Sequence, residues 1–245
     1  GRALVYWFTY TPPAVGSEQS QAWIGGIGEI RGSSIVVPSA DSWISSGPPF
    51  GPDFDPGRVA LSPWGKFVLS FTDCGNGLMY YRSDDPDYGS GSLDLRRLSS
   101  IDTLACGEPA PAPPLSQFAV FPALSGAWYD PTHEGERWLL EILSDRQALL
   151  AWFSYDPNGK QAWFLNIGEI DGDAITFDLT IPSGTDFGPG FDPAEIIRPP
   201  WGRAVFRFDG CSSGSMSYQS ALEDYGSGEL ELVRLTSLWG LECSP

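Results

Sequence analysis

The sequence predicts an all-β protein made of two tandem antiparallel domains, each a β-barrel or a β-sandwich, that arose by internal duplication. Short apolar segments alternate with turns rich in glycine and proline, of which the chain has 29 and 22, and this spacing is typical of antiparallel sheets. No segment has the periodicity of a long amphipathic helix. The duplication divides the 245 residues into a first copy at 1–107, a proline-rich linker at 108–121 and a second copy at 122–245.

Five motifs recur in the same order in the two copies. In the first and second copy respectively they are Tyr-Trp-Phe-Thr-Tyr at 6–10 and Ala-Trp-Phe-Ser-Tyr at 151–155, Gln-Ala-Trp at 21–23 and 161–163, Phe-Gly-Pro at 50–52 and 187–189, Trp-Gly at 64–65 and 201–202, and Asp-Tyr-Gly-Ser-Gly at 87–91 and 224–228. Each copy is long enough to bury a core of its own.

Alternation of apolar and polar residues predicts the strands, because successive side chains of a strand point to opposite faces. The clearest case is 175–181, where Ile175, Phe177, Leu179 and Ile181 alternate with Thr and Asp. In chain order, the expected strands cover 3–10, 35–37, 64–71, a segment ending at Tyr81, 93–95, 138–143, 148–155, 161–170, 175–181, 201–208, a segment ending at Tyr218, and 230–232.

The two copies differ at their front ends. The second copy begins with Ser-Gly-Ala-Trp-Tyr-Asp-Pro at 125–131 and the strand at 138–143, whereas the first copy begins directly at the equivalent of Ala148. If both copies share a fold, the first lacks front strand structure and exposes a sheet edge and part of its core. One interpretation is that preceding residues were removed or are disordered.

The second interpretation is that a strand from a neighbouring chain fills the gap, as in donor-strand complementation, and that head-to-tail repetition builds a filament. Self-association is then expected. The acceptor edge and the candidate donor segment, a further predicted strand next to the linker, are formed by Leu4, Tyr6, Trp7, Phe118, Val120 and Phe121. A chain terminus is an alternative donor.

The four cysteines form two equal intervals of 32 residues at matching places in the copies, which predicts the disulfides Cys74–Cys106 and Cys211–Cys243. A zinc site would need short paired spacings and histidines, and the chain has one histidine. Disulfides persist outside the reducing cytosol, so an extracellular or periplasmic location is expected. The absence of a signal-peptide pattern is interpreted as a mature form.

The net charge of −17 argues against binding to nucleic acid or to an anionic bilayer, since a phosphate-binding face needs clustered Lys and Arg. No apolar run approaches the ~20 residues of a transmembrane helix, so membrane insertion is not expected.

The motifs Ser-Gly-x-Trp-Tyr-Asp-Pro at 125–131, Trp-Phe-x-Tyr-Asp-Pro-x-Gly-x-Gln-x-Trp at 152–163 and Trp-Gly-x-x-x-Phe-x-Phe at 201–208, followed by Cys211, form one pattern. This pattern resembles an aromatic β-repeat of secreted Gram-negative bacterial proteins that has no established activity. The resemblance covers nearly all of the second copy and most of the first. It implies export and modular repetition, and it implies no chemistry.

No catalytic residue is expected. The single histidine, His133, lies in a turn-like segment without an equivalent in the first copy, and we interpret it as structural. Glu29 and Glu169 occupy matching positions, for which a turn-stabilising role is favoured over a carboxylate that faces a pocket. No nucleophile elbow or phosphate loop occurs. The protein is therefore predicted not to be an enzyme.

No cofactor or metal is expected, with calcium as the open alternative. The oxygens for calcium would come from acidic residues in two loops, but their spacing matches no calcium loop, and Asp before Pro is an ordinary turn former. These residues are Asp53, Asp55, Asp84, Asp85 and Asp87.

Two functions from different classes fit these features. The main prediction is a non-enzymatic exported structural or adhesive subunit that forms a filament by strand complementation. The alternative is a secreted carbohydrate-binding module, in which Trp23, Trp43 and Trp163 would stack on sugar rings. Exposure of these rings in a groove would favour the alternative, and their burial at contacts between chains would favour the main prediction.

Overall fold

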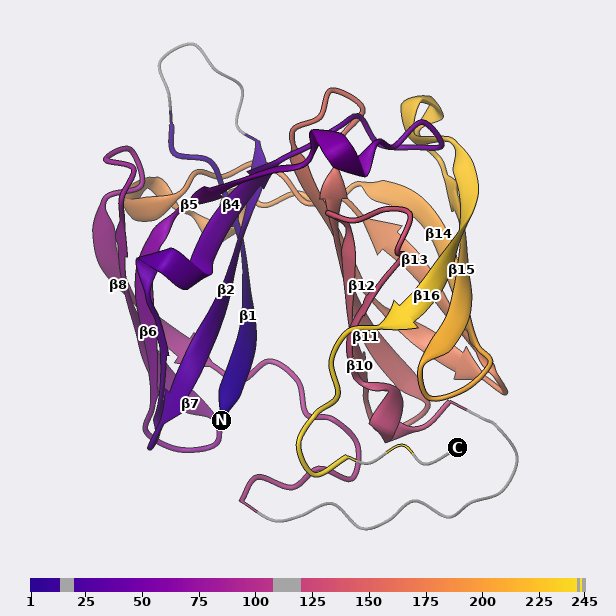
Figure 1. Cartoon of the computed structure of the whole chain (residues 1–245), viewed down its shortest axis with the longest axis horizontal. Helices are drawn as coiled ribbons and strands as arrows, with labels where there is room; N and C mark the ends of the chain where they lie inside the picture. Colours follow the sequence, from indigo (N-terminus) through magenta and orange to yellow (C-terminus); the bar gives the residue numbers. More distant parts are fainter. Residues whose placement is uncertain (14–19, 108–119, 242, 244–245) are drawn as a thin grey trace.

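The computed structural model describes residues 1–13, 20–107, 120–241 and 243, which form two antiparallel β-units side by side (Figure 1). Unit one contains β1–β8, and the second unit, the barrel, contains β9–β16. The all-β class and the two β-rich units predicted from the sequence are therefore confirmed.

Unit one is an open sheet in which β1 pairs with one edge of β2, while β3 and β4 pair with different parts of its other edge. The strands β6, β7 and β8 follow β3, and β5 follows β4. Its strands are β1 (Arg2–Tyr10), β2 (Gln21–Arg31), β3 (Ser34–Val37), β4 (Ser42–Ser46), β5 (Ala60–Pro63), β6 (Gly65–Phe71), β7 (Asn76–Ser83) and β8 (Ser90–Arg96). Two 3₁₀ turns, η1 (Ser39–Asp41) and η2 (Pro56–Arg58), flank β4 and β5.

The barrel closes because β9 pairs with both β10 and β16. Its strands are β9 (Gly126–Tyr129), β10 (Arg137–Ile142), β11 (Gln147–Tyr155), β12 (Gln161–Asp171), β13 (Ala174–Thr180), β14 (Pro200–Phe208), β15 (Ser213–Ser220) and β16 (Ser227–Arg234). The 3₁₀ turns are η3 (Pro122–Leu124), η4 (Gly188–Gly190), η5 (Pro193–Glu195) and η6 (Glu223–Tyr225). The alternation expected in 175–181 is observed, with Ile175, Phe177 and Leu179 buried inside.

The repeated Trp-Gly motif has a steric cause. Gly65 and Gly202 both adopt positive φ angles, 143° and 153°, which glycine tolerates best. A Cβ on either would lie 2.3 Å from the carbonyl oxygen of a residue on the neighbouring strand, Arg82 or Gln219. The preceding Trp64 and Trp201 are fully buried, so the motif lets the backbone cross tightly while anchoring a large side chain.

Both predicted disulfides are confirmed, Cys74–Cys106 and Cys211–Cys243, with Cα–Cα separations of 6.0 and 5.6 Å. Each ties the turn after β6 or β14 to the segment that follows the last strand of its unit. Two disulfides fit an oxidising extracellular or periplasmic compartment.

The two units pack through a nearly symmetric interface built from the repeated Gln-Ala-Trp motif. Gln21 donates through Nε2 to the carbonyl of Trp163 (2.8 Å) and accepts from its N–H (3.0 Å). Gln161 makes the same pair of bonds with Trp23, at 2.8 and 3.2 Å. The same patch on both partners thus forms the contact, as in a two-fold homodimer.

The Phe-Gly-Pro loops exchange their aromatic side chains between the units. Phe50 of unit one enters the barrel core, where its ring lies 5.4 Å from those of Trp152 and Tyr218. Phe187 of the barrel enters the core of unit one, 5.4 Å from Trp7 and 5.5 Å from Tyr81. Each unit is therefore plugged at one end by the other.

One predicted element is corrected. The extra strand expected at 118–121 is not a strand in its described part, since Val120 and Phe121 have no strand conformation. Both residues pack against the barrel core, and the N–H of Val120 donates to Gly172 O at 3.3 Å. Phe118 lies outside the described residues.

Candidate functional site

The open side of unit one is the feature that distinguishes it from the barrel. In the barrel, β9 and β10 lie between β16 and β11 and close the sheet. In unit one the corresponding strands β8 and β1 each pair on one side, and the described residues contain no strand between them. The sequence-based expectation that the first copy has an unclosed sheet agrees with this topology.

In the described structure, one edge of β1 has no strand beside it, whereas the corresponding edge of β11 in the barrel is paired with β10. Residues 137–142 of β10 pair with residues 148–153 of β11, and the latter correspond to residues 3–8 of β1. Unpaired N–H and C=O groups in such a row are a template for another strand. The edge is therefore suited to β-strand addition.

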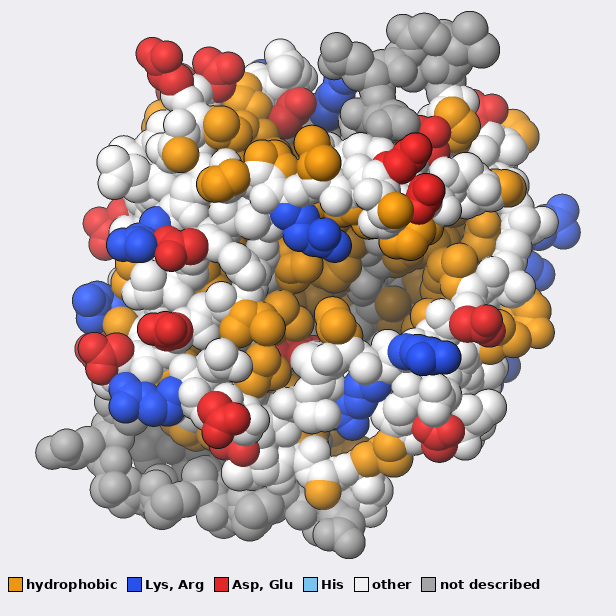
Figure 2. Space-filling model, turned by 180° about the vertical axis from the view of Figure 1, so that it is seen from behind, with side chains coloured by type: hydrophobic (Ala, Val, Ile, Leu, Met, Phe, Trp, Pro, Cys, Tyr) orange, Lys and Arg blue, Asp and Glu red, His pale blue; other side chains and the backbone are white. Residues whose placement is uncertain are grey.

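Matched side chains at this opening differ in exposure. Phe71 and Leu93 of unit one are 41% and 39% exposed, whereas their barrel counterparts Phe208 and Leu230 are 4% and 7% exposed. Figure 2 shows a hollow with hydrophobic walls in the half of that view that unit one occupies. The same residue types are thus core in the closed unit and surface in the open one.

A hollow of about 400 Å³ lies at one end of this opening, and Phe71, Leu95 and Arg97 are among its lining residues. The barrel residues at these positions are Phe208, Leu232 and Arg234, and the first two belong to the same buried core cluster as Trp128 of β9. The Trp128 ring lies 5.1 Å from that of Phe208 and 5.7 Å beneath the Arg234 guanidinium. In the barrel, the corresponding space is therefore occupied by a tryptophan.

Arg234 also holds the front of the barrel in place. Its guanidinium donates to the carbonyls of Ala123, Ser125 (3.0 Å) and Thr236 (3.0 Å), and to that of Cys211 (3.2 Å). The first two carbonyls belong to the segment that leads into β9.

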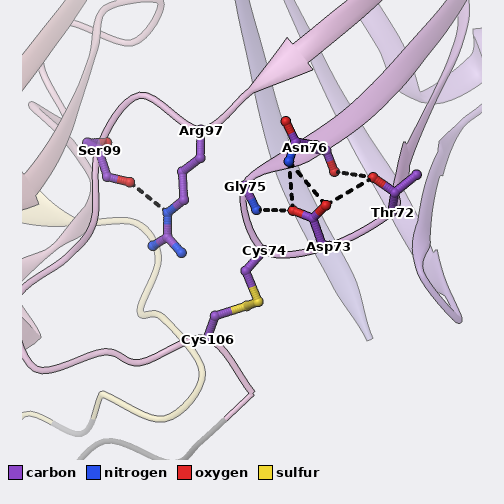
Figure 3. The surroundings of a disulfide bond; sticks show 8 residues. All are labelled: Thr72, Asp73, Cys74, Gly75, Asn76, Arg97, Ser99 and Cys106. Carbon is purple, nitrogen blue, oxygen red and sulfur yellow. Dashed lines mark hydrogen bonds between the residues drawn. A yellow bond between two sulfur atoms is a disulfide. The ribbon is translucent and has the colours of Figure 1, made fainter.

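The guanidinium of the counterpart Arg97 makes one hydrogen bond within the described part of the chain, from Nε to Ser99 O at 2.7 Å. In Figure 3, its other two nitrogens have no bond to the residues drawn, and Arg97 and Cys74 line the same hollow. The adjacent turn is fixed by Asp73, which accepts from the N–H of Gly75 (2.7 Å) and from Asn76. These bonds hold the pKa of Asp73 below its usual range.

A further matched pair, Phe54 and Phe191, also differs in exposure. Phe54 is 7% exposed because it packs on His133 of the β9–β10 loop, at 5.1 Å, and on Tyr155. Its counterpart Phe191 is 47% exposed, since the described part of unit one has no β9–β10 loop to cover it. His133 therefore has a packing contact, and Thr132 and Asp130 lie beside its Nδ1 at 3.0 and 3.5 Å.

The structure separates the residues predicted for assembly. Tyr6 faces the barrel, with its ring stacked 4.4 Å from Phe153, and Trp7 faces the core of unit one. Leu4 is half-buried on β1. Val120 and Phe121 pack on the barrel, so the described part of the predicted donor segment is engaged within the same chain.

The three tryptophans predicted for glycan stacking lie near the contact between the units. Trp23 and Trp163 are buried, and their Nε1 atoms donate to Ser154 O and Thr9 O, both at 3.2 Å. Trp43 is half-buried beside Tyr6, over Gly25. Protein atoms thus cover the Trp23 and Trp163 rings.

Glu136, which sequence reasoning missed, is a buried carboxyl at the start of the barrel. It precedes β10 and accepts a hydrogen bond from the hydroxyl of Ser154. Burial, with a smaller contribution from nearby Asp130, raises its pKa to about 8. No counterpart in the first copy could have marked it, because its segment is not repeated.

The acidic side chains weighed for calcium are engaged in turns or exposed. Asp55 and Asp85 accept hydrogen bonds from the N–H groups of Gly57 and Asp87, both at 3.0 Å. Glu29 and Glu169 lie on the outer surface, and Glu29 pairs with Arg31 at 2.7 Å. Within 1–13, 20–107, 120–241 and 243, no cluster of three or more His, Cys, Asp or Glu could hold a metal.

The chain has no match among protein-family models, curated protein sequences or solved structures. Across the ranges that the structure describes, helices long and apolar enough to cross a bilayer are absent. The candidate functional site is therefore the open side of unit one, as defined by its topology and its exposed apolar residues.

Proposed function

We propose that this protein is a non-enzymatic structural or adhesive subunit, exported to an oxidising compartment, that joins another polypeptide chain by β-strand addition. The observation that carries the proposal is the match between the units. The barrel shows how this fold looks when closed, and the described part of unit one has strands at the positions of β11 to β16 but none at the positions of β9 and β10.

The energetics favour a partner on this side. Each backbone hydrogen bond that the free edge gains contributes a net of about 0.5–1.5 kcal/mol, and apolar area such as that of Phe71 and Leu93 contributes about 25 cal/mol per Å² when it is covered. Strand addition satisfies both requirements at once, because it supplies backbone partners and apolar side chains together. A filament made by head-to-tail repetition remains a prediction.

Closing the opening genetically tests the proposal. Gly1 O accepts from Ile30 N at the place where Arg146 O accepts from Ile170 N, so a copy of residues 125–145 placed directly before Gly1 has the length to form the missing strands. We expect the original protein to associate in size-exclusion chromatography with light scattering. The extended protein should be monomeric and about 3–5 kcal/mol more stable, the amount that a buried tryptophan typically contributes.

The matched control carries the same extension with both of its tryptophans changed to Ser, and it should behave as the original protein does. Hydrogen exchange should show protection of the β1 amides in the extended form. The proposal fails if the original protein is a monomer in dilute solution with β1 amides already protected, or if the extension leaves association unchanged.

A further inference from the structure

The opening of unit one is lined by residues whose counterparts in the barrel pack against the β9–β10 hairpin. Trp128 contacts Phe208 and Arg234 and shares a core cluster with Leu232, and these three positions recur in unit one as Phe71, Arg97 and Leu95, which line the hollow. Trp128 is fully buried in the barrel, and the hollow in unit one is lined by the same residue types, so it has the chemistry of a tryptophan site. An aromatic ring under a guanidinium gains a cation–π contact in addition to apolar burial.

Arg97 adds a backbone requirement. In the barrel, Arg234 donates to two carbonyls of the segment that enters β9. The unused guanidinium nitrogens of Arg97, counted among the described residues, are placed to do the same for an incoming chain. A segment that binds here must therefore run along β8 with two carbonyls turned toward Arg97.

Two free edges require two strands. β8 corresponds to β16, which pairs with β9, and β1 corresponds to β11, which pairs with β10. A single strand could satisfy one edge and would leave the other open. A hairpin such as β9–β10 satisfies both, because β9 and β10 also pair with each other.

A second copy of this chain is a poor donor. Its β9–β10 hairpin is already paired on both sides in its own barrel, so donating it would open one sheet in order to close another. The net gain in buried surface and hydrogen bonds would be close to zero. This consideration favours a source of the hairpin other than the barrel of a second copy. The self-association expected of the original protein is then a pairing of its open sheet edges, which the hairpin would replace.

We infer that unit one is a receptor for a two-stranded β-hairpin that lies outside residues 1–245, whose first strand carries a tryptophan that enters the hollow formed by Phe71, Leu95 and Arg97. The inference rests on the proposed function and adds the chemistry of the partner to it. The pattern expected in the partner is that of β9–β10, with Gly-x-Trp in the first strand and Trp-Leu-Leu in the second.

A peptide experiment tests the tryptophan site on the intact chain. The probe is a fluorescently labelled synthetic peptide with the sequence of residues 125–147, and its binding is measured by anisotropy. We expect saturable binding, and we expect the peptide with Trp128→Ala to bind at least about tenfold more weakly, which corresponds to 1.4 kcal/mol. Arg97→Ala in the protein should weaken binding of the unchanged peptide by a similar factor.

The matched control is Arg82→Ala, which removes an exposed arginine on β7 of the same sheet and should change the affinity less than about twofold, well below the tenfold criterion. Equal affinity of the two peptides would overturn the tryptophan site while leaving strand addition standing. Failure of both peptides to saturate would overturn the hairpin receptor, and the extension experiment would still decide the proposed function separately. A protein that is already a closed dimer and excludes the peptide would identify a second copy as the occupant and would also overturn the inference.

Discussion

Unit one and the barrel have matching strands and matching motifs, yet one is open and the other closed. The difference comes from β9 and β10, which contribute Trp128 and Trp138, and from the segment before β9, which contributes two carbonyl groups bound by Arg234. Wherever these partners are present, the shared residues are buried and bonded. Where they are absent from the described structure, Phe71, Phe191 and Arg97 are left exposed. The comparison teaches that the open unit carries, at these positions, the same residue types that a closed sheet buries.

The largest expected change in stability comes from removing the rings that each unit inserts into the core of the other. Phe50→Ala should destabilise the protein by about 3–4 kcal/mol, because it empties a site inside the closed barrel. Phe187→Ala should cost about 2–3 kcal/mol, since that ring packs in a sheet that is open on one side. Urea unfolding followed by tryptophan fluorescence would measure both changes.

The control for this pair is Phe191→Ala in the same loop, which should change stability by less than about 0.5 kcal/mol because the ring is exposed. An equal loss for Phe187 and Phe191 would show that the exchange of aromatic rings between the units does not stabilise the fold.

The two equivalent arginines should give the next largest difference. Arg234→Ala should cost about 2–3 kcal/mol, because it removes several charged hydrogen bonds and the guanidinium over Trp128. Arg97→Ala should cost less than about 0.5 kcal/mol, as is typical of exposed positions. Chemical denaturation compares the two variants, and hydrogen exchange in β9 should increase for Arg234→Ala. Similar losses for both arginines would contradict the assignment of Arg97 as an unused partner.

The smallest expected effect, counted per pH unit, is a pH dependence of stability that comes from Glu136 in the barrel. The Glu136 carboxyl is neutral in the folded protein up to a pKa of about 8, while in the unfolded chain it ionises near its ordinary value. Between these values the unfolded state binds fewer protons, so stability is highest at low pH and falls as pH rises, by at most about 1.4 kcal/mol per unit. Glu136→Gln should remove this slope.

Unfolding free energies measured from pH 5 to pH 8 would show the change, with Glu229→Gln as the control because Glu229 is exposed on β16. A slope that is the same in Glu136→Gln as in the original protein would mean that other groups carry the pH dependence.

Several features followed from the sequence alone. The equal spacing of Cys74–Cys106 and Cys211–Cys243 determined the disulfides, because two matched intervals leave one simple pairing. The alternation in segments such as 175–181 determined the strands, since side chains of a strand point to opposite faces. The unmatched front end of the second copy indicated which unit would be open.

Only the tertiary structure decided which neighbour each buried side chain meets. The Gln-Ala-Trp motif and the Phe-Gly-Pro loop were visible as repeats, but periodicity reports burial and does not name the partner. Trp23 and Trp163 are buried between the units, and Phe50 fills the core of the other unit. The physical reason is that apolar surface lowers the free energy equally in a core or in an interface, so the choice depends on contacts between residues more than a hundred positions apart.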